Sequence, residues 1–370
     1  MSPSPSSSLP RPPLRGLRRW VRAAAYAALL ALALEGGARL ALSSDAFLRR
    51  ISSPYDEPSW RLRWLRRHQE GEAPYRFSFD RFDSVRGWTL APNLHQLEVF
   101  DGKRLTSNSR GLRGAREYAV PKPAGVTRIA LFGDSFTFGE DVSDDETFAQ
   151  QMERLLPGVE VMNFGVHGYG HDQMLLYLRE TLPIYRPDVV LVGYVTDDSL
   201  RNLTRFRDFA KPRFRLRDGK LVIEGTPVPS PDELIARERW RLRFGDLLSM
   251  AASRIAWKWG GKAAELDQLT DALLSEMFRE AAAAGARPAV ALLPAWGELG
   301  ATSAEPLPGE RFVMDLAQRD RTPCLRLRPL FLEQARLGAE FEKVGHWGPL
   351  EHRIAAGGIV DFLRREGLVP

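Results

Sequence analysis

From residue 127 onward, short apolar segments alternate with longer segments in which apolar residues recur at helical spacing. The apolar segments have the length and the β-branched content of buried strands. They predict five strands, at residues 128–133, 159–164, 188–194, 287–293 and 324–327. Helices are predicted at residues 145–156, 170–184, 264–284, 309–319 and 350–366. This alternation indicates an α/β fold, a three-layer α/β/α sandwich with a five-stranded parallel sheet covered on both faces.

Residues 200–262 interrupt this alternation as an insertion after the third strand. The stretch FRLRDGKLVIEGTPVPSP within it predicts a hairpin with a Pro-rich loop. Long insertions at strand ends commonly lie beside functional sites. We expect Trp240, Trp257 and Trp259 to be core residues, with stacking on sugars and membrane anchoring as the alternatives. Residues 45–120, rich in Arg, Trp and turn residues, predict a β-rich extension packed on the main domain.

Residues 1–44 predict a disordered basic tail followed by a signal-anchor helix. The apolar core Ala23–Leu34 is short for a membrane span, whereas extension to Leu42 is long enough but includes Glu35 and Arg39, four residues apart. The arginines before this core predict a single-pass inner-membrane protein with the rest of the chain in the periplasm. The alternatives are a cleaved signal peptide, which gives a secreted protein, and a soluble amphipathic helix.

Charge and cysteine content exclude several classes of function. The net charge is +5, and residues 1–22 contain five arginines and no acid, so the other 348 residues are formally neutral. A nucleic-acid partner is therefore not expected, because such proteins carry a basic face on the folded part. Cys324 is the only cysteine, which excludes an internal disulfide and a Cys-based zinc site. Without a metal cluster, phosphate loop or dinucleotide motif in the sequence, we predict no cofactor and no metal.

A small polar triplet, Gly133-Asp134-Ser135, directly follows the first predicted strand. Ligands of open α/β sheets bind at the carboxyl ends of the strands, and a serine there becomes a nucleophile if a base lies beside it. The best candidate base is His346, in a turn before the last predicted helix, whereas His352 lies inside that helix and is expected to cap or pack. We assign Asp134 to loop stabilisation by an Asx-type hydrogen bond.

Two further loops at the same edge offer hydrogen-bond donors. Gly165, in VMNFGVHGYGHDQ, can bring its backbone N–H close to a ligand because it has no side chain. A side-chain donor in GYVTDDSLRN, Thr196 or Asn202, could complete an oxyanion hole, which stabilises the charge that develops in acyl transfer.

The stretches FGDSFTFGEDV, NFGVHGYGHDQ and GHWGPLEHRIAA resemble blocks one, two and five of the SGNH/GDSL hydrolase superfamily, over residues 121–370. The run from GWTLAPN through SNSRGLRG to FGDSFTFGEDV resembles its bacterial membrane-anchored members. The resemblance implies the flavodoxin-like SGNH fold. It also implies that Ser135 is the nucleophile and an oxyanion donor through its N–H, that Gly165 is the second donor, and that His346 is the base.

Two positions depart from the family pattern. The Asn-Asp pair of block three reads Thr196-Asp197 here, and a carboxylate cannot donate a hydrogen bond. The acid that orients the histidine in the family lies two or three residues before it, where this chain has Val344 and Lys343; the nearest carboxylate is Glu342. The resemblance therefore leaves a Ser-His dyad, a triad completed by Glu342, or a weakly active site as the possibilities.

The resemblance implies a serine esterase or deacylase that hydrolyses an ester, an O-acyl group on an envelope glycan or lipid, through an acyl-enzyme. The expected partners are this acylated carbohydrate or lipid and, through the N-terminal helix, the membrane. The alternatives are a polysaccharide O-acetyltransferase of the same fold, suggested by the GHWGP loop, and a catalytically inactive SGNH domain that serves as an envelope binding module.

Overall fold

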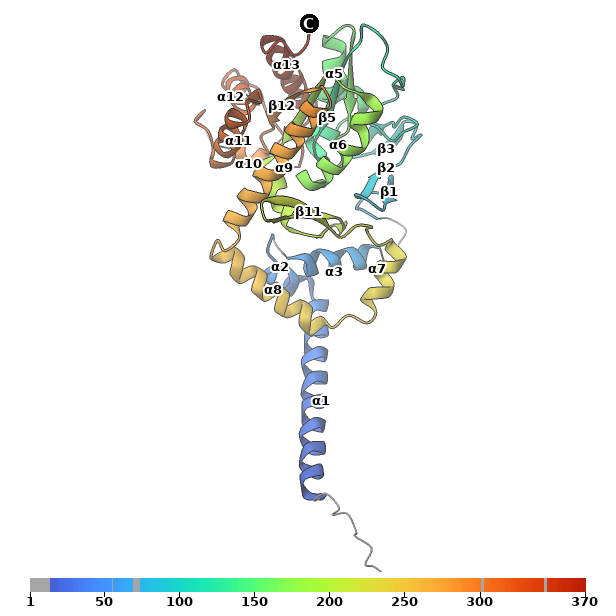
Figure 1. The fold of residues 1–370 in the computed structure, drawn as a ribbon, viewed down its shortest axis with the longest axis vertical. Helices are drawn as coiled ribbons and strands as arrows, with labels where there is room; N and C mark the ends of the chain where they lie inside the picture. The colour runs from blue at the N-terminus through green and yellow to red at the C-terminus, as the bar shows by residue number, and fades with distance from the viewer. Residues whose placement is uncertain (1–13, 55, 69–73, 301–302, 343–344) are drawn as a thin grey trace, which may run out of the picture.

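The computed structural model describes residues 14–54, 56–68, 74–300, 303–342 and 345–370, with the backbone alone for residues 14–17. Helix α1 (Leu14–Ser43) leaves the rest of the chain as one long helix (Figure 1). By length and composition, its segment 18–43 is suited to cross a membrane, and signal sequences meet the same criterion. Only 11% of its most apolar stretch is buried in the rest of the structure. The disordered tail predicted before it lies mostly outside the described residues.

The five predicted strands are confirmed to within one residue at each end. They are β5 (Thr127–Phe132), β6 (Val159–Asn163), β7 (Val189–Tyr194), β12 (Arg287–Leu292) and β13 (Cys324–Arg326). They form one parallel sheet in the order β13-β12-β7-β5-β6. Strand β5, the first of these five along the chain, thus lies between the second and the third. The direction of winding reverses at its carboxyl end, where ligands of open α/β sheets bind.

Helices cover both faces of the sheet, as predicted. One face carries α6 (His171–Tyr185), α9 (Ala263–Ala283) and α11 (Pro308–Arg319), and the other carries α5 (Phe148–Leu155), α12 (Arg328–Arg336) and α13 (Pro349–Arg365). Side chains of β5 alternate between the two cores: Ala130 and Phe132 lie in the first, Ile129 and Leu131 in the second. Helix α12 was not predicted; it is short and begins with a proline at its first turn.

The insertion after β7 contains both strands and helices. It begins with the 3₁₀ helix η2 (Thr196–Leu203) and the short strands β8 (Phe206–Arg207) and β9 (Phe209–Ala210). The predicted hairpin follows as β10 (Arg213–Arg217) and β11 (Lys220–Glu224), and then α7 (Pro231–Glu238) and α8 (Arg243–Lys258). The expected burial of three tryptophans is wrong: Trp240, Trp257 and Trp259 are 89%, 46% and 78% exposed.

The segment 45–120 is β-rich only in its second half. Two hairpins form there, β1 (Asp80–Asp83) with β2 (Gly87–Leu90) and β3 (Leu97–Val99) with β4 (Lys103–Leu105). The first half instead forms α2 (Asp45–Ile51) and α3 (Glu57–Arg67). Asp56 caps α3 by accepting a hydrogen bond from the N–H of Ser59, and Pro58 occupies its first turn, so local signals favour the helix.

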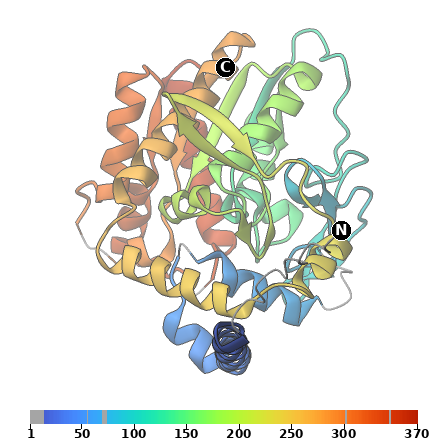
Figure 2. The same cartoon turned by 60° about the horizontal axis from the view of Figure 1, so that its bottom comes forward.

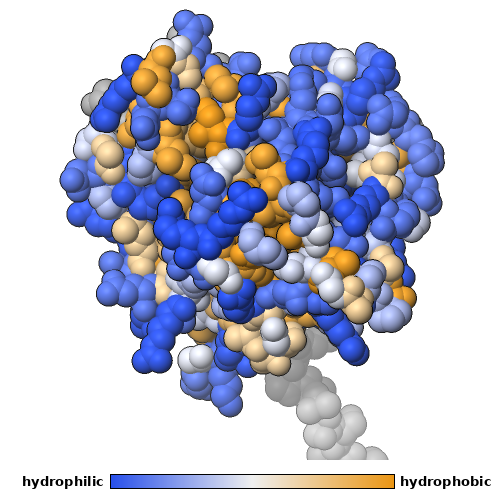
Figure 3. All heavy atoms as spheres, turned by 90° about the horizontal axis from the view of Figure 1, so that it is seen from above, coloured by the Kyte–Doolittle hydropathy of each residue, from blue (hydrophilic) through white to orange (hydrophobic). Residues whose placement is uncertain are grey.

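The helices α2, α3 and α8 lie together at the end of the body from which α1 leaves (Figures 1 and 2). The opposite end, seen in Figure 3, has a mainly hydrophilic rim around apolar residues in the middle.

Candidate active site

Ser135 lies directly after β5, in the first turn of the short helix α4 (Ser135–Phe138). The carboxylate of Asp134 caps this turn by accepting a hydrogen bond from the N–H of Phe136 at 3.0 Å, the Asx-type role expected for it. Gly133 is required here because a Cβ atom at this position would lie 2.0 Å from Oγ1 of Thr137. The tight turn holds the Ser135 side chain at the carboxyl edge of the sheet, where Ser135 is only 4% exposed.

The loop before α13 brings His346 to this serine. Nε2 of His346 lies 2.8 Å from Oγ of Ser135, although the two residues are 211 positions apart. The neighbouring Trp347 holds the loop, since it is buried and its indole N–H donates to the carbonyl of Pro294, just beyond β12, at 3.0 Å. The ring of Phe136 packs against both His346 and Trp347. The structure thus brings together the two residues that the sequence proposed as nucleophile and base.

Two acids that the sequence reasoning missed lie at the other ring nitrogen. Nδ1 of His346 is 3.4 Å from Oδ2 of Asp141 and 3.8 Å from Oε1 of Glu140. The backbone N–H of His346 donates to the same oxygen of Asp141. Glu140 also pairs with Arg76. A proton on Nδ1 that points to Asp141 leaves Nε2 unprotonated toward Ser135, which is the tautomer a general base needs.

The turn after α4 explains how this acid reaches the histidine. Gly139 ends α4 in the left-handed conformation, with φ of 85°, and Asp141 also has a positive φ of 70°. The chain therefore folds back and presents the Asp141 carboxylate to the His346 loop. On that loop Gly345 has φ of 86°, and a Cβ atom there would lie 3.1 Å from the same carboxylate oxygen.

The electrostatics of the site favour a proton on the histidine. Burial lowers the pKa of His346, but the hydrogen bond to Asp141 and the charges of Glu140, Asp134 and Asp141 outweigh it, so that the pKa is raised above its ordinary value. The hydrogen bond from His346 in turn lowers the pKa of Asp141. By contrast, burial lowers the pKa of His352 to about 3, and its Nδ1 accepts a hydrogen bond from the N–H of Phe148. His352 is thus a neutral packing and capping residue, as expected.

Among the described residues, the acids within ion-pair distance of His346 are Glu140 and Asp141, and Glu342 is not one of them. Its backbone N–H donates to the carboxylate of Glu351 at 2.6 Å, and its side chain packs near Gly348. The expectation that Glu342 orients His346 is therefore not met by the structure, and Lys343 and Val344 lie outside the described residues. The signal for the acids is present in the sequence, in the Glu-Asp pair just after the turn that carries Ser135. The family pattern does not point to this pair, because it places the orienting acid before the histidine.

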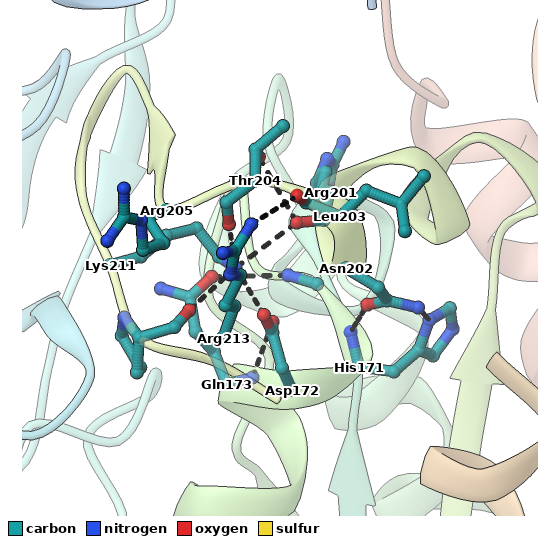
Figure 4. A network of polar contacts seen from close by, with 12 residues as sticks. His171, Asp172, Gln173, Arg201, Asn202, Leu203, Thr204, Arg205, Lys211 and Arg213 are labelled. Atoms are coloured by element: carbon teal, nitrogen blue, oxygen red, sulfur yellow. Dashed lines mark hydrogen bonds and ion pairs between the residues drawn. The ribbon is translucent and has the colours of Figure 1, made fainter. Parts of the chain in front are cut away.

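Three of the four expected oxyanion donors have other partners in this structure. The N–H of Gly165 donates to Oδ1 of Asn163 at 2.9 Å. The hydroxyl of Thr196 donates to Glu298 at 2.8 Å, on the β12 side of the sheet. The amide of Asn202 donates to Thr270 and is within 3.1 Å of Nδ1 of His171, while its oxygen accepts from the N–H of His171 (Figure 4). Asn202 is fully buried and joins α6 to α9, which removes it from the expected role.

A second buried network beside Asn202 fixes the insertion to α6. The ammonium group of Lys211 is fully buried, pairs with Asp172 in the first turn of α6, and donates to the carbonyls of Arg201, Thr204 and Pro212 (Figure 4). All three of its protons can therefore be used, which is the condition for burying a lysine. These bonds hold the start of the insertion against α6, next to the carboxyl edge of the sheet.

Arg201 connects the start of the insertion to the turn that carries Ser135. Its guanidinium pairs with Asp198 at 2.7 Å, donates to the carbonyl of Tyr169 at 2.7 Å, and reaches Oδ2 of Asp134 at 3.4 Å. Arg201 also lines a cleft of about 440 Å³ between η2 and helix α3, with Trp60, Arg63 and Arg207 among the other lining residues. The residue before Ser135 thus contacts a side chain that borders the cleft.

The site also offers a set of potential metal ligands. One atom from each of Glu140, Asp141 and His346 lies within 4.8 Å of the others. A cation bound there through Nδ1 would replace the hydrogen bond from His346 to Asp141, so these residues serve either as an orienting set or as ligands.

Comparisons with known proteins gave structural similarities only. No family model matches the chain, and no curated protein matches it. Among solved structures, a member of the lipolytic protein G-D-S-L family from Veillonella parvula is 13% identical, with 65% of this chain and 100% of that chain covered and a TM-score of 0.39. The psychrotrophic esterase EstA from Pseudoalteromonas sp. is 10% identical, with 65% and 98% covered and a TM-score of 0.39. The acetyl xylan esterase AlAXEase is 12% identical, with 63% and 98% covered and a TM-score of 0.38. At these values the similarities do not by themselves assign an activity, which is inferred below from the site.

Proposed function

We propose that the chain is an ester hydrolase of the SGNH/GDSL type, with Ser135 as nucleophile and His346 as general base. The observation that carries the proposal is the 2.8 Å separation of Ser135 Oγ and His346 Nε2, with a carboxylate at Nδ1 of the same ring. A nucleophile, a base within hydrogen-bond distance and a group that orients the base are the three parts that acyl transfer requires. The α/β/α sandwich and the order of the three motifs along the chain support the same family.

In the proposed mechanism, Oγ of Ser135 attacks the ester carbonyl carbon while Nε2 of His346 takes the hydroxyl proton. Asp141, with Glu140, stabilises the imidazolium that forms. The tetrahedral intermediate then expels the alcohol, which receives the proton from His346. Water attacks the acyl-serine in the second half, with His346 again as base, and the carboxylic acid leaves as Ser135 recovers its proton.

The proposed oxyanion hole consists of backbone amides. The N–H of Ser135, at the start of α4, belongs to the N-terminal amides that have no partner within a helix. The N–H of Gly165 is the second proposed donor, and it would exchange its present bond to Asn163 for one to the oxyanion. Without an Asn side chain at the block-three position, one donor fewer is available. Loss of one donor costs about 100- to 1000-fold in rate in a well-studied protease.

We further propose that the substrate is an O-acylated glycan or lipid of the cell envelope, and that α1 anchors the enzyme to the inner membrane with the sheet domain in the periplasm. Two observations support this location. Among the described residues, one exposed helix is long and apolar enough to span a bilayer. Helix α3 lines the side of the cleft opposite Arg201, and α3 lies at the end of the body from which α1 leaves (Figure 1).

The proposal is tested by treating the full-length protein in detergent with a fluorophosphonate probe and locating the adduct by mass spectrometry. We expect an adduct on Ser135 that is lost in His346→Ala and retained in His95→Ala, because His95 is exposed and lies in another loop. A folded protein without an adduct would refute the esterase and favour a binding module. Transfer of acetyl from p-nitrophenyl acetate to an oligosaccharide, in preference to water, would instead indicate an acyltransferase.

A further inference from the structure

Helix α1 and helix α8 are joined end to side by specific contacts. The carboxylate of Glu35 accepts hydrogen bonds from the N–H groups of Arg243 and Phe244, both at 3.0 Å, and these belong to the first turn of α8. Arg39, one turn further along α1, donates to the carbonyl of Arg241. The Glu35 side chain of α1 thus caps the amino end of α8. This contact fixes the position of α8 along α1.

The last turns of α1 belong to the core of the body. Ala38 and Leu42 are each 2% exposed, and Leu42 packs in one cluster with Met250 of α8 and with residues of α2 and α3. Leu34, one turn before Ala38, is 41% exposed. The helix therefore emerges from the body near Glu35, at the level where α8 begins.

The outer face of α8 is apolar and exposed. Leu248, Ile255 and Trp259 follow one another at spacings of seven and four residues, so they lie on one stripe, and Ala251 and Ala252 between them are also exposed. Their exposed fractions of 56%, 61% and 78% contrast with Met250 on the opposite face, which is fully buried. Just before the helix, Trp240 and Leu242 are exposed as well.

The surroundings of this stripe are basic. Residues 236–262 contain seven lysines and arginines but only two acids, Glu238 and Asp246. Both acids are buried and pair with Arg61 of α3 and with Arg241 and Arg243 of the same segment. Seven cations against two acids leave this segment a formal charge of +5. The surface around the stripe therefore carries an excess of positive charge. An apolar stripe with flanking tryptophans and cations is the composition of a helix that lies in the interface of an anionic bilayer.

Figures 1 and 2 show that α8 runs across the end of the body from which α1 leaves. We propose that α8, with Trp240 and Trp259 at its ends, lies on the surface of the bilayer that α1 crosses. Its apolar stripe then contacts the headgroup region of anionic lipids. This platform, defined by residues 240–259, holds α3 and the cleft beside Arg201 at a fixed height above the membrane. A protein anchored by α1 alone would be free to tilt, whereas the platform fixes its orientation.

The test uses spin labels on the full-length protein in nanodiscs that contain phosphatidylcholine with phosphatidylglycerol. The only native cysteine is removed by Cys324→Ser, and a label is then placed at Leu248→Cys or Ile255→Cys. Leu337→Cys is the matched control, because Leu337 is 75% exposed at the end of α12, away from α8. The ratio of relaxation by oxygen to relaxation by a water-soluble nickel chelate is measured for each label. Circular dichroism confirms that each variant is folded.

We expect labels at positions 248 and 255 to be at least about threefold more accessible to oxygen, relative to the nickel chelate, than the label at 337, because oxygen concentrates in lipid and the charged chelate does not. Ratios equal to that at 337 would overturn the proposal, since the stripe would then face water. Labels shielded from both reagents would also overturn it, because a protein partner or a second copy would then cover the stripe. Absence of the chain from the nanodisc fraction would overturn it as well. None of these readouts depends on esterase activity, so the platform and the proposed catalysis fail independently.

Discussion

Replacement of Asp141 by Asn is the sharpest test of the proposal that Asp141 orients His346. The substitution keeps the size of the side chain but removes the charge 3.4 Å from Nδ1 of His346. Because the pKa of His346 is raised above its ordinary value partly by this carboxylate, loss of the charge lowers that pKa. A general base works only in its neutral form. The rate of ester hydrolysis should therefore persist to lower pH in the variant.

The size of the shift follows from the distance. Two unit charges 3.4 Å apart interact by about 1.2 kcal/mol in a water-like dielectric, and about 1.4 kcal/mol corresponds to one pKa unit. The lower dielectric of a buried pair would give several times more, but the Asp141 side chain is 46% exposed and water screens it. We expect the acid limb of the pH profile to move down by about one unit. Glu140→Gln should move it less, because Arg76 already balances the charge of Glu140.

The assay is hydrolysis of p-nitrophenyl acetate, with kcat/KM measured between pH 5 and pH 9. Asp145→Asn, an exposed residue that changes the net charge equally, serves as control. At pH 8 we also expect Asp141→Asn to lose about 10- to 100-fold in kcat, less than the roughly 10⁴-fold of a buried triad acid, since Glu140 remains nearby. An acid limb that stays where it is, or one that moves equally in Asp145→Asn, would refute the assignment of Asp141 as the orienting acid.

Three further substitutions test packing around the site. Lys211→Met should destabilise the folded state by about 3–5 kcal/mol in urea denaturation because it leaves the buried Asp172 without a counter-charge, whereas the exposed Lys220→Met should have little effect. His352→Phe should cost about 1–3 kcal/mol in the same assay by leaving the N–H of Phe148 unpaired, and a neutral result would contradict the capping role. Thr137→Val should be neutral or slightly stabilising in thermal unfolding, since the buried Thr137 hydroxyl has no hydrogen-bond partner among the described residues; a large loss would reveal a partner for it.

The central sheet could be predicted because its signal is local. Each strand is an apolar segment buried on both faces, and each crossover helix has its own periodicity, so both appear in short windows of sequence. The helices α2 and α3 were missed, although Asp56 and Pro58 mark the start of α3, because the burial of their faces depends on distant partners. Arg61 of α3, for example, is buried only because Glu238 and Asp246 of the insertion neutralise it. No local pattern distinguishes such an arginine from an exposed one.

The tryptophans of the insertion also depend on distant contacts, but here a predicted burial was wrong. Aromatic residues are buried in most soluble folds, and that tendency predicted a core position for Trp240 and Trp259. Their exposure depends on how α8 packs on the body, where Met250 lies in one buried cluster with Leu42 of α1. The sequence contains both partners, but not the fact that residues more than 200 positions apart meet.

The position of the acid changes what the His346 loop has to do. In the pattern of the superfamily, the loop that carries the histidine also carries its orienting acid. Here Asp141 follows Ser135 by only six residues, so the proposed nucleophile and the proposed acid are held on one short segment of chain. The imidazole then bridges two groups of one rigid segment, through Nε2 on one side and Nδ1 on the other. The His346 loop needs only one firm attachment to the sheet domain, which Trp347 supplies through Pro294. Replacement of the acid before the histidine is therefore compatible with a complete site, because the geometry that a triad needs is supplied from the nucleophile side.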